Sequence, residues 1–159
     1  MGVIPDDQAI ATIHASIDAG ANFIDTAEGY QTSEGVLGKA LRGRRDEVFL
    51  ATKLTGDHSL EHMMQAIENS LSSLGTDYID LYQTHWPERK ANYFGTLDYT
   101  HVEDDDWTPM EEQLAALGEQ VKAGKIRAIG VSNETAWGLM KFQEIAERTG
   151  LPRIASIQN

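Results

Sequence analysis

The stretch Asn22-Phe23-Ile24-Asp25-Thr26-Ala27-Glu28-Gly29-Tyr30 shows the pattern that organises the whole chain. A short apolar run ends in the carboxylate of Asp25, and Tyr30 follows five residues later in a segment that contains glycine. The apolar run predicts a buried strand, and the polar residues after it predict a turn or loop. A strand that ends in a reactive side chain is therefore the feature to look for in the rest of the sequence.

The same pattern occurs four more times. Apolar runs at 48–52, 78–84, 126–131 and 154–157 are followed by Lys53, His85, Ser132-Asn133 and Gln158. In folds built from parallel strands, side chains at the carboxyl ends of several strands meet at one rim of the sheet. We therefore expect the five strand ends to form one site.

Composition and charge limit the classes of protein to consider. The chain has 159 residues, of which 41% are hydrophobic and 24% charged, and these values are typical of a globular domain with one core. No stretch approaches the roughly 20 apolar residues that a membrane span needs. The absence of cysteine excludes a disulfide scaffold and fits a reducing compartment, so we predict a cytoplasmic location. A net charge of −12 argues against nucleic acids and membrane surfaces as partners, because it repels phosphate groups.

Helical segments separate the predicted strands. The clearest is 59–74, where apolar residues lie on one face and Gly75 supplies a natural end. Shorter helical patterns begin near Asp6 and at Ser33, and another precedes the fifth strand at 134–148. The segment Thr108-Pro109-Met110-Glu111 predicts a capping box with proline at the first helical position.

The strict alternation of helices and apolar strands predicts an α/β protein with a parallel sheet covered by helices. An open doubly wound sheet and part of a (β/α)8 TIM barrel both fit this order. No G-x-G-x-x-G follows a strand, so the nucleotide-binding open sheet lacks its marker, whereas chemistry at many strand ends is typical of a barrel. Because eight strands need about 250 residues, we predict an incomplete barrel, about strands 2 to 6, from a longer protein.

Five segments resemble the aldo-keto reductase family. They are 23–30 with its Asp-x4-Tyr spacing, Ala51-Thr52-Lys53, Thr84-His85-Trp86-Pro87, 125–133 with Gly-Val-Ser-Asn, and Ile157-Gln158-Asn159. Trp86-Pro87-Glu88-Arg89 is most similar to a bacterial, Tas-like subgroup. The resemblance extends over nearly the whole chain, so residues 1–159 are expected to form a partial reductase barrel. Residues 86–107 are expected to form an inserted loop at the substrate site.

The resemblance implies a catalytic tetrad of Asp25, Tyr30, Lys53 and His85. NADPH would deliver a hydride to an aldehyde or ketone, and Tyr30 would supply the proton. A free tyrosine has a pKa of about 10 and is a poor acid at neutral pH, so a neighbouring Lys53 ammonium would help by stabilising the phenolate. Asp25 would hold Lys53 in place, and His85 would orient the carbonyl oxygen.

The resemblance also implies contacts to the cofactor, and the aromatic residues of the inserted loop suggest contacts to the substrate. Ser132, Asn133 and Gln158 match the residues that hold the nicotinamide carboxamide, and the preference for NADPH over NADH is implied by the family alone. Three aromatic residues of the inserted loop are expected to line the pocket of a small carbonyl substrate: Trp86, Tyr93 and Phe94. No metal site is predicted, because His58 and His62 lack a third ligand. Both histidines are expected on the surface or on a helix face.

Each candidate residue also has a simpler explanation. Asp25 could cap a turn, and Tyr30 could be a packing aromatic with a hydrogen-bonded tip. His85 could be a buried structural histidine. Ser132 or Asn133 could be the N-cap of the helix at 134–148. Only the five strand ends taken together favour a catalytic site over these explanations.

Two other functions are compatible with the pattern. A non-catalytic module could use bound nucleotide as a sensor, as the potassium-channel β subunits of the family do. A barrel aldolase could use Lys53 as a Schiff base, but this chemistry needs an uncharged lysine, and Asp25 would favour the charged form. We predict the reductase, and we expect the 159-residue segment alone to be inactive.

Overall fold

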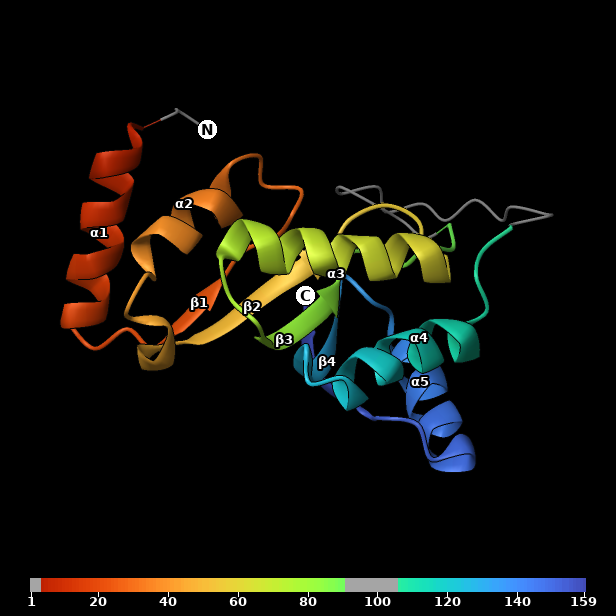
Figure 1. Cartoon of the computed structure of the whole chain (residues 1–159). Coiled ribbons are helices and arrows are strands. Elements are labelled where there is room, and N and C mark those ends of the chain that lie inside the picture. The colour runs from red at the N-terminus through yellow and green to blue at the C-terminus, as the bar shows by residue number, and fades with distance from the viewer. Residues whose placement is uncertain (1–3, 91–105) are drawn as a thin grey trace.

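The computed structural model describes residues 4–90 and 106–159, which form a five-stranded sheet with helices (Figure 1). The strands are β1 (Phe23–Asp25), β2 (Phe49–Leu54), β3 (Ile79–Thr84), β4 (Ile126–Ser132) and β5 (Ile154–Gln158). The helices are α1 (Asp6–Asp18), α2 (Ser33–Ala40), α3 (Leu60–Leu74), α4 (Met110–Lys122) and α5 (Ala136–Thr149), with a 3-10 turn η1 (Arg45–Glu47). Every strand and helix predicted from the sequence is present.

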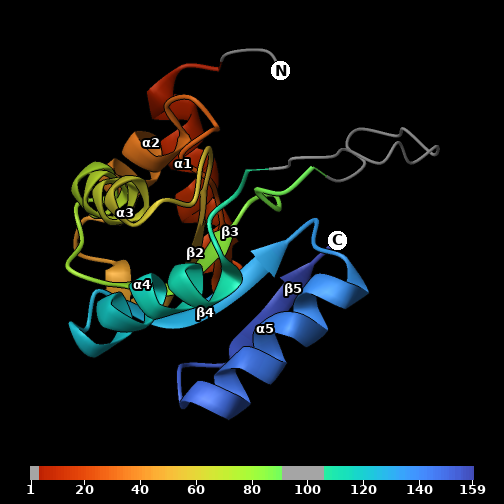
Figure 2. The same ribbon diagram turned by 90° about the vertical axis from the view of Figure 1, so that its right-hand side faces the viewer.

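The strand order distinguishes the two architectures. The sheet runs β1-β2-β3-β4-β5, and every neighbouring pair is parallel. A doubly wound sheet would reverse its order at a switch point, whereas a barrel adds each strand beside the previous one. The sheet curves, and the helices lie along its outer side (Figure 2). The described residues therefore form an arc of the predicted (β/α)8 type.

Alternation along the strands gives the sheet two different faces. Leu50, Tyr82 and Ile129 point toward the helices and are fully buried, together with Ile67 of α3 and Leu114 of α4. The residues next to them point to the concave side, where the side chains are mostly polar toward the carboxyl ends of the strands. The apolar face thus fixes the strands against the helices and leaves the concave rim available for chemistry.

The observed helix caps agree with those predicted from the sequence for α3 but not for α4. Ser59 caps α3 by accepting a hydrogen bond from the backbone of His62, and Gly75 ends this helix in the left-handed conformation at φ 63°. The predicted capping box at α4 is wrong. Pro109 is the N-cap, and Thr108 donates its hydroxyl to Glu88 at 3.3 Å instead.

The start of α5 excludes the simpler explanation that Ser132 or Asn133 is the N-cap of this helix. Its N-cap is Thr135, whose hydroxyl accepts from the backbone of Gly138 at 3.1 Å. Ser132 and Asn133 lie before this cap and bond elsewhere.

No helix among the described residues is both long enough and apolar enough to cross a membrane.

Candidate active site

The first two strand ends form an ion pair in which the lysine is buried and the aspartate is partly exposed. Asp25 is the last residue of β1, and Lys53 is the fifth residue of β2. The ammonium of Lys53 is bonded to the carboxylate of Asp25 and donates to the carbonyl oxygen of Thr26 at 3.0 Å. Lys53 is only 2% exposed, so its charge depends on these two acceptors. The pair fixes the position of the Lys53 ammonium at the concave rim.

Tyr30 and His85 lie beside this ion pair. The hydroxyl of Tyr30 is 3.4 Å from Nε2 of His85, and the two rings meet edge to face with their centroids 5.4 Å apart. The Lys53 ammonium lies 5.3 Å from the centre of the Tyr30 ring. The structure therefore brings together all four residues of the predicted tetrad, although they are distributed over residues 25–85.

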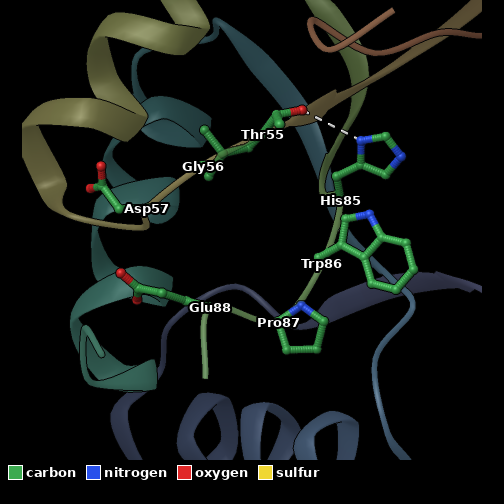
Figure 3. Close-up of a pocket in the computed structure, with 8 residues that line it drawn as sticks. Thr55, Gly56, Asp57, His85, Trp86, Pro87 and Glu88 are labelled. Carbon is green, nitrogen blue, oxygen red and sulfur yellow. Dashed lines mark hydrogen bonds between the residues drawn. The ribbon is translucent and has the colours of Figure 1, made fainter. Parts of the chain in front are cut away.

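The environment of His85 sets its protonation. Burial is the main cause that lowers the pKa of His85, and the positive charge of Lys53 lowers this pKa further. The imidazole is therefore neutral at pH 7, with one nitrogen as donor and the other as acceptor. Its Nδ1 faces the hydroxyl of Thr55 at 3.4 Å (Figure 3). The other nitrogen, Nε2, faces Tyr30.

Two residues near the tetrad were missed by the sequence reasoning. The amide of Gln83 donates to Asp25 Oδ1 at 3.3 Å, and Thr55 contacts His85. Gln83 lies two residues before His85, so the period of two along the strand places it on the same face. That signal was present in the sequence. The contact of Thr55 depends on the loop after β2, for which the sequence gives no comparable signal.

The fourth and fifth strand ends form a cluster of amides and a hydroxyl. Ser132 donates to the backbone oxygen of Gln158 at 2.9 Å. The side-chain amide of Asn133 donates to the backbone oxygen of His85 at 2.8 Å. The amide of Gln158 reaches Asp25 Oδ2 at 3.4 Å. The structure thus connects this cluster to the tetrad at two points.

A pocket of about 490 Å³ opens next to His85 (Figure 3). Its lining is Leu54, Thr55, Gly56, Asp57, His85, Trp86, Pro87 and Glu88. Trp86 is one of these residues, with its ring centroid 6.4 Å from that of His85. Tyr93 and Phe94, with most of the predicted 86–107 insertion, lie outside the described residues.

The base of the pocket rests on a buried polar network. The carboxylate of Glu88 accepts from the backbone nitrogens of His58 at 3.0 Å and of Thr108 at 2.7 Å. The ring of His58 is bonded to Gln113 of α4 at 2.7 Å and is 2% exposed. The expectation that His58 lies on the surface is therefore wrong, because it joins the loop before α3 to α4.

Within residues 4–90 and 106–159, no group of three histidines or carboxylates has the arrangement of a metal site.

Residues 1–159 match the sequence model of the Aldo/keto reductase family. The chain belongs to this family. Protein tas of Escherichia coli (strain K12) is 38% identical over 177 residues, which cover 94% of this chain and 51% of that protein. Aldo-keto reductase YhdN of Bacillus subtilis (strain 168) is 38% identical, with 91% and 43% covered. This aldo/keto reductase chain thus spans about half the length of the curated relatives it matches.

A solved structure extends the comparison to the fold. The aldo/keto reductase of Klebsiella pneumoniae, in complex with NADP and acetate, superposes with a TM-score of 0.70 at 36% identity. The match covers 86% of this chain and 43% of that protein. The barrel-type arc described above is therefore the arrangement found in the family.

Proposed function

We propose that the full-length protein reduces an aldehyde or ketone to an alcohol with NADPH, and that Tyr30 donates the proton. The observation that carries the proposal is the geometry of Tyr30, whose hydroxyl lies 3.4 Å from His85 Nε2 and whose ring lies 5.3 Å from the Lys53 ammonium. Family membership supports the reaction class. The Klebsiella relative, whose structure holds NADP, supports the choice of cofactor.

Proton donation needs a stabilised phenolate. When the Tyr30 hydroxyl gives its proton to the carbonyl oxygen of the substrate, negative charge forms on the phenol oxygen. The Lys53 ammonium is a fixed, buried positive charge, and such preorganised charges stabilise developing anions without reorganisation. Asp25 keeps Lys53 in one position and balances its charge in the ground state.

His85 acts as a neutral hydrogen-bonding group in this scheme. Because its pKa is lowered, the imidazole carries no charge at neutral pH and does not compete with Tyr30 as the acid. A carbonyl oxygen bound between the Tyr30 hydroxyl and His85 Nε2 would be oriented by both groups. Trp86 would pack against the remainder of the substrate in the adjoining pocket.

The amide cluster fits the carboxamide of a nicotinamide. When bound, NADPH supplies the hydride that reduces the carbonyl carbon. A carboxamide has two donors and one acceptor, and Ser132, Asn133 and Gln158 offer a hydroxyl and two amides. Among the described residues, nothing donates to the side-chain oxygens of Asn133 and Gln158, so both remain available as acceptors. These residues would hold the ring against the rim where the tetrad lies.

The aldolase alternative is weakened by the surroundings of Lys53. A Schiff-base lysine must lose its proton before it attacks a carbonyl. Lys53 instead donates to the carboxylate of Asp25 and to the oxygen of Thr26, so its nitrogen is already held by two acceptors. No described contact favours the nucleotide-sensing alternative.

The test uses the full-length protein with NADPH and 4-nitrobenzaldehyde. Tyr30→Phe should lower kcat by about a hundredfold or more, because it removes the proton donor and leaves cofactor affinity unchanged. Tyr78→Phe is the matched control, since Tyr78 donates its hydroxyl to Asp46 at 3.1 Å and precedes β3 at the opposite end of the sheet. Unchanged turnover in Tyr30→Phe would refute the assignment of the proton donor.

A further inference from the structure

A second buried ion pair joins the loops that follow β3 and β4. Arg89 Nη1 donates to Glu134 Oε2 at 3.0 Å, and Nη2 bonds the other carboxylate oxygen, so the contact is bidentate. The two side chains are 14% and 2% exposed. The guanidinium also donates to Thr135 at 3.1 Å and lies 5.1 Å from the ring centre of Trp137. This pair plays no part in the reaction as proposed above.

Stability alone gives a weak reason for such a pair. Removing two charges from water is costly, and apolar residues of the same volume often replace buried ion pairs without loss of stability. A bidentate arginine–carboxylate contact provides a fixed geometry, because the planar guanidinium donates to both carboxylate oxygens at once. The pair therefore fixes the position of one loop relative to the other.

The neighbouring residues in both loops belong to the proposed site. Glu134 follows Asn133 directly, and Arg89 lies four residues after His85. Between the two loops, the amide of Asn133 donates to the backbone oxygen of His85 at 2.8 Å. Asn133 itself has a φ of 53°, in the left-handed region that asparagine adopts more readily than most other residues. The ion pair and the Asn133–His85 bond are thus two adjacent links between the same loops.

Gly138 of α5 shows how closely the ion pair is packed. A Cβ at this position would overlap the carboxylate of Glu134 and the guanidinium of Arg89. Glycine is otherwise unfavourable inside a helix relative to alanine. A single methyl group here would displace the ends of both charged side chains, which are the atoms nearest to it.

We propose that Arg89 and Glu134 are positioning residues of the reductase, which hold Asn133 against His85 and so set the distance between the catalytic imidazole and the nicotinamide-binding amides. The inference rests on the proposed function. It adds a pair of residues that touches neither the reacting atoms nor the cofactor. A displacement near 1 Å at a catalytic group costs on the order of a hundredfold in rate, so a loosened pair should affect catalysis more than folding.

The first test is Glu134→Gln in the full-length protein, compared with Asp80→Asn. The Arg45–Asp80 pair is a matched control, because its side chains are 14% and 5% exposed and it lies at the opposite end of β3. Both variants should lower Tm. Only Glu134→Gln should lower kcat with 4-nitrobenzaldehyde by about tenfold or more and raise the Kd of NADPH by about fivefold.

The second test uses glycine variants that keep every charge. Gly138→Ala should reproduce the losses in kcat and NADPH affinity with little change in Tm, since the helix gains an alanine while the ion pair is displaced. Gly35→Ala in α2 is its control, because a Cβ there meets no described atom within 4 Å. It should leave kcat and the Kd of NADPH unchanged.

A third measurement keeps this inference separate from the proposed function. In the absence of cofactor, the ring resonances of His85 should shift in Glu134→Gln and Gly138→Ala, but not in Asp80→Asn or Gly35→Ala. If the wild-type protein reduces no aldehyde, the proposed function fails, and the His85 resonances still test the positioning. Glu134→Gln and Gly138→Ala with kinetics and His85 resonances like those of the wild type would overturn the inference.

Discussion

Lys53 illustrates how the concave rim keeps a charge where solvent is almost excluded. An unpaired ammonium in such a place would be strongly unfavourable, and Lys53 avoids this with one carboxylate and one backbone acceptor. Burial costs desolvation free energy, but it also strengthens the attraction between Lys53 and Asp25, because the local dielectric constant is low. A positive charge held in this way can act on Tyr30 without first rearranging solvent.

The pH dependence of His85 is a prediction at the scale of a single residue. Burial and the charge of Lys53 lower its pKa in the folded protein, whereas in the unfolded chain it titrates at about 6.5. As the pH falls below that value, the unfolded state binds the proton first, so folding stability decreases until the folded pKa is passed. Above about pH 6.5, His85 makes no such contribution.

Two measurements check this expectation. An NMR titration should show the His85 ring taking up its proton at a lower pH than an ordinary histidine. In denaturant unfolding of the full-length protein, His85→Gln should reduce the loss of stability on acidification. His58, whose pKa is also lowered by burial, remains in both proteins and cancels from the difference. A His85 pKa at or above the ordinary value would contradict the account.

At the scale of the elements, the amphipathic pattern located the helices better than the capping residues did. Ser59 and Gly75 end α3 as expected, because a small polar side chain and a glycine satisfy local geometry. Thr108 had the right type and spacing for a cap, but its backbone N–H and its hydroxyl both donate to the carboxylate of Glu88. A cap prediction considers only local bonds, and an acceptor twenty residues away in the sequence can override it.

Gly75 gives a prediction for a single helix end. It has a φ of 63°, and a Cβ there would meet no described atom within 4 Å. Gly75→Ala should therefore destabilise the full-length protein through the backbone alone, by about 1 kcal/mol. Urea unfolding measures the change, and Gly35→Ala, inside α2 and equally open, should cause no loss. Equal stability of wild type and Gly75→Ala would show that the left-handed conformation is not required.

At the scale of the whole molecule, the described residues leave the concave face partly apolar. Phe23 and Phe49 stack with their ring centres 5.1 Å apart on this face, and they are 56% and 40% exposed. Among the described residues, β1 and β5 each have one neighbour in the sheet. Exposed aromatic pairs and unpaired strand edges favour association with other chains.

A segment of residues 1–159 expressed alone should therefore bind an apolar dye such as ANS and self-associate. It should also show no reduction of 4-nitrobenzaldehyde by NADPH under conditions in which the full-length protein is active. Size-exclusion chromatography, dye fluorescence and the turnover assay check the three expectations. The full-length protein is the control. A monomeric segment that binds no dye and turns over substrate would contradict this view of the concave face.

The sequence by itself determined the order of the elements and the side chain at each strand end. Alternating apolar runs and helical spacing are local signals, and Asp25, Lys53 and His85 are read directly from where those runs stop. The tertiary structure decided which of these groups touch. Tyr30 and His85 are 55 residues apart, Arg89 and Glu134 are 45 apart, and the amide of Asn133 turns to His85 although its sequence position suits a helix cap. Such contacts depend on the register between strands and on the paths of loops, which are fixed by packing over the whole sheet.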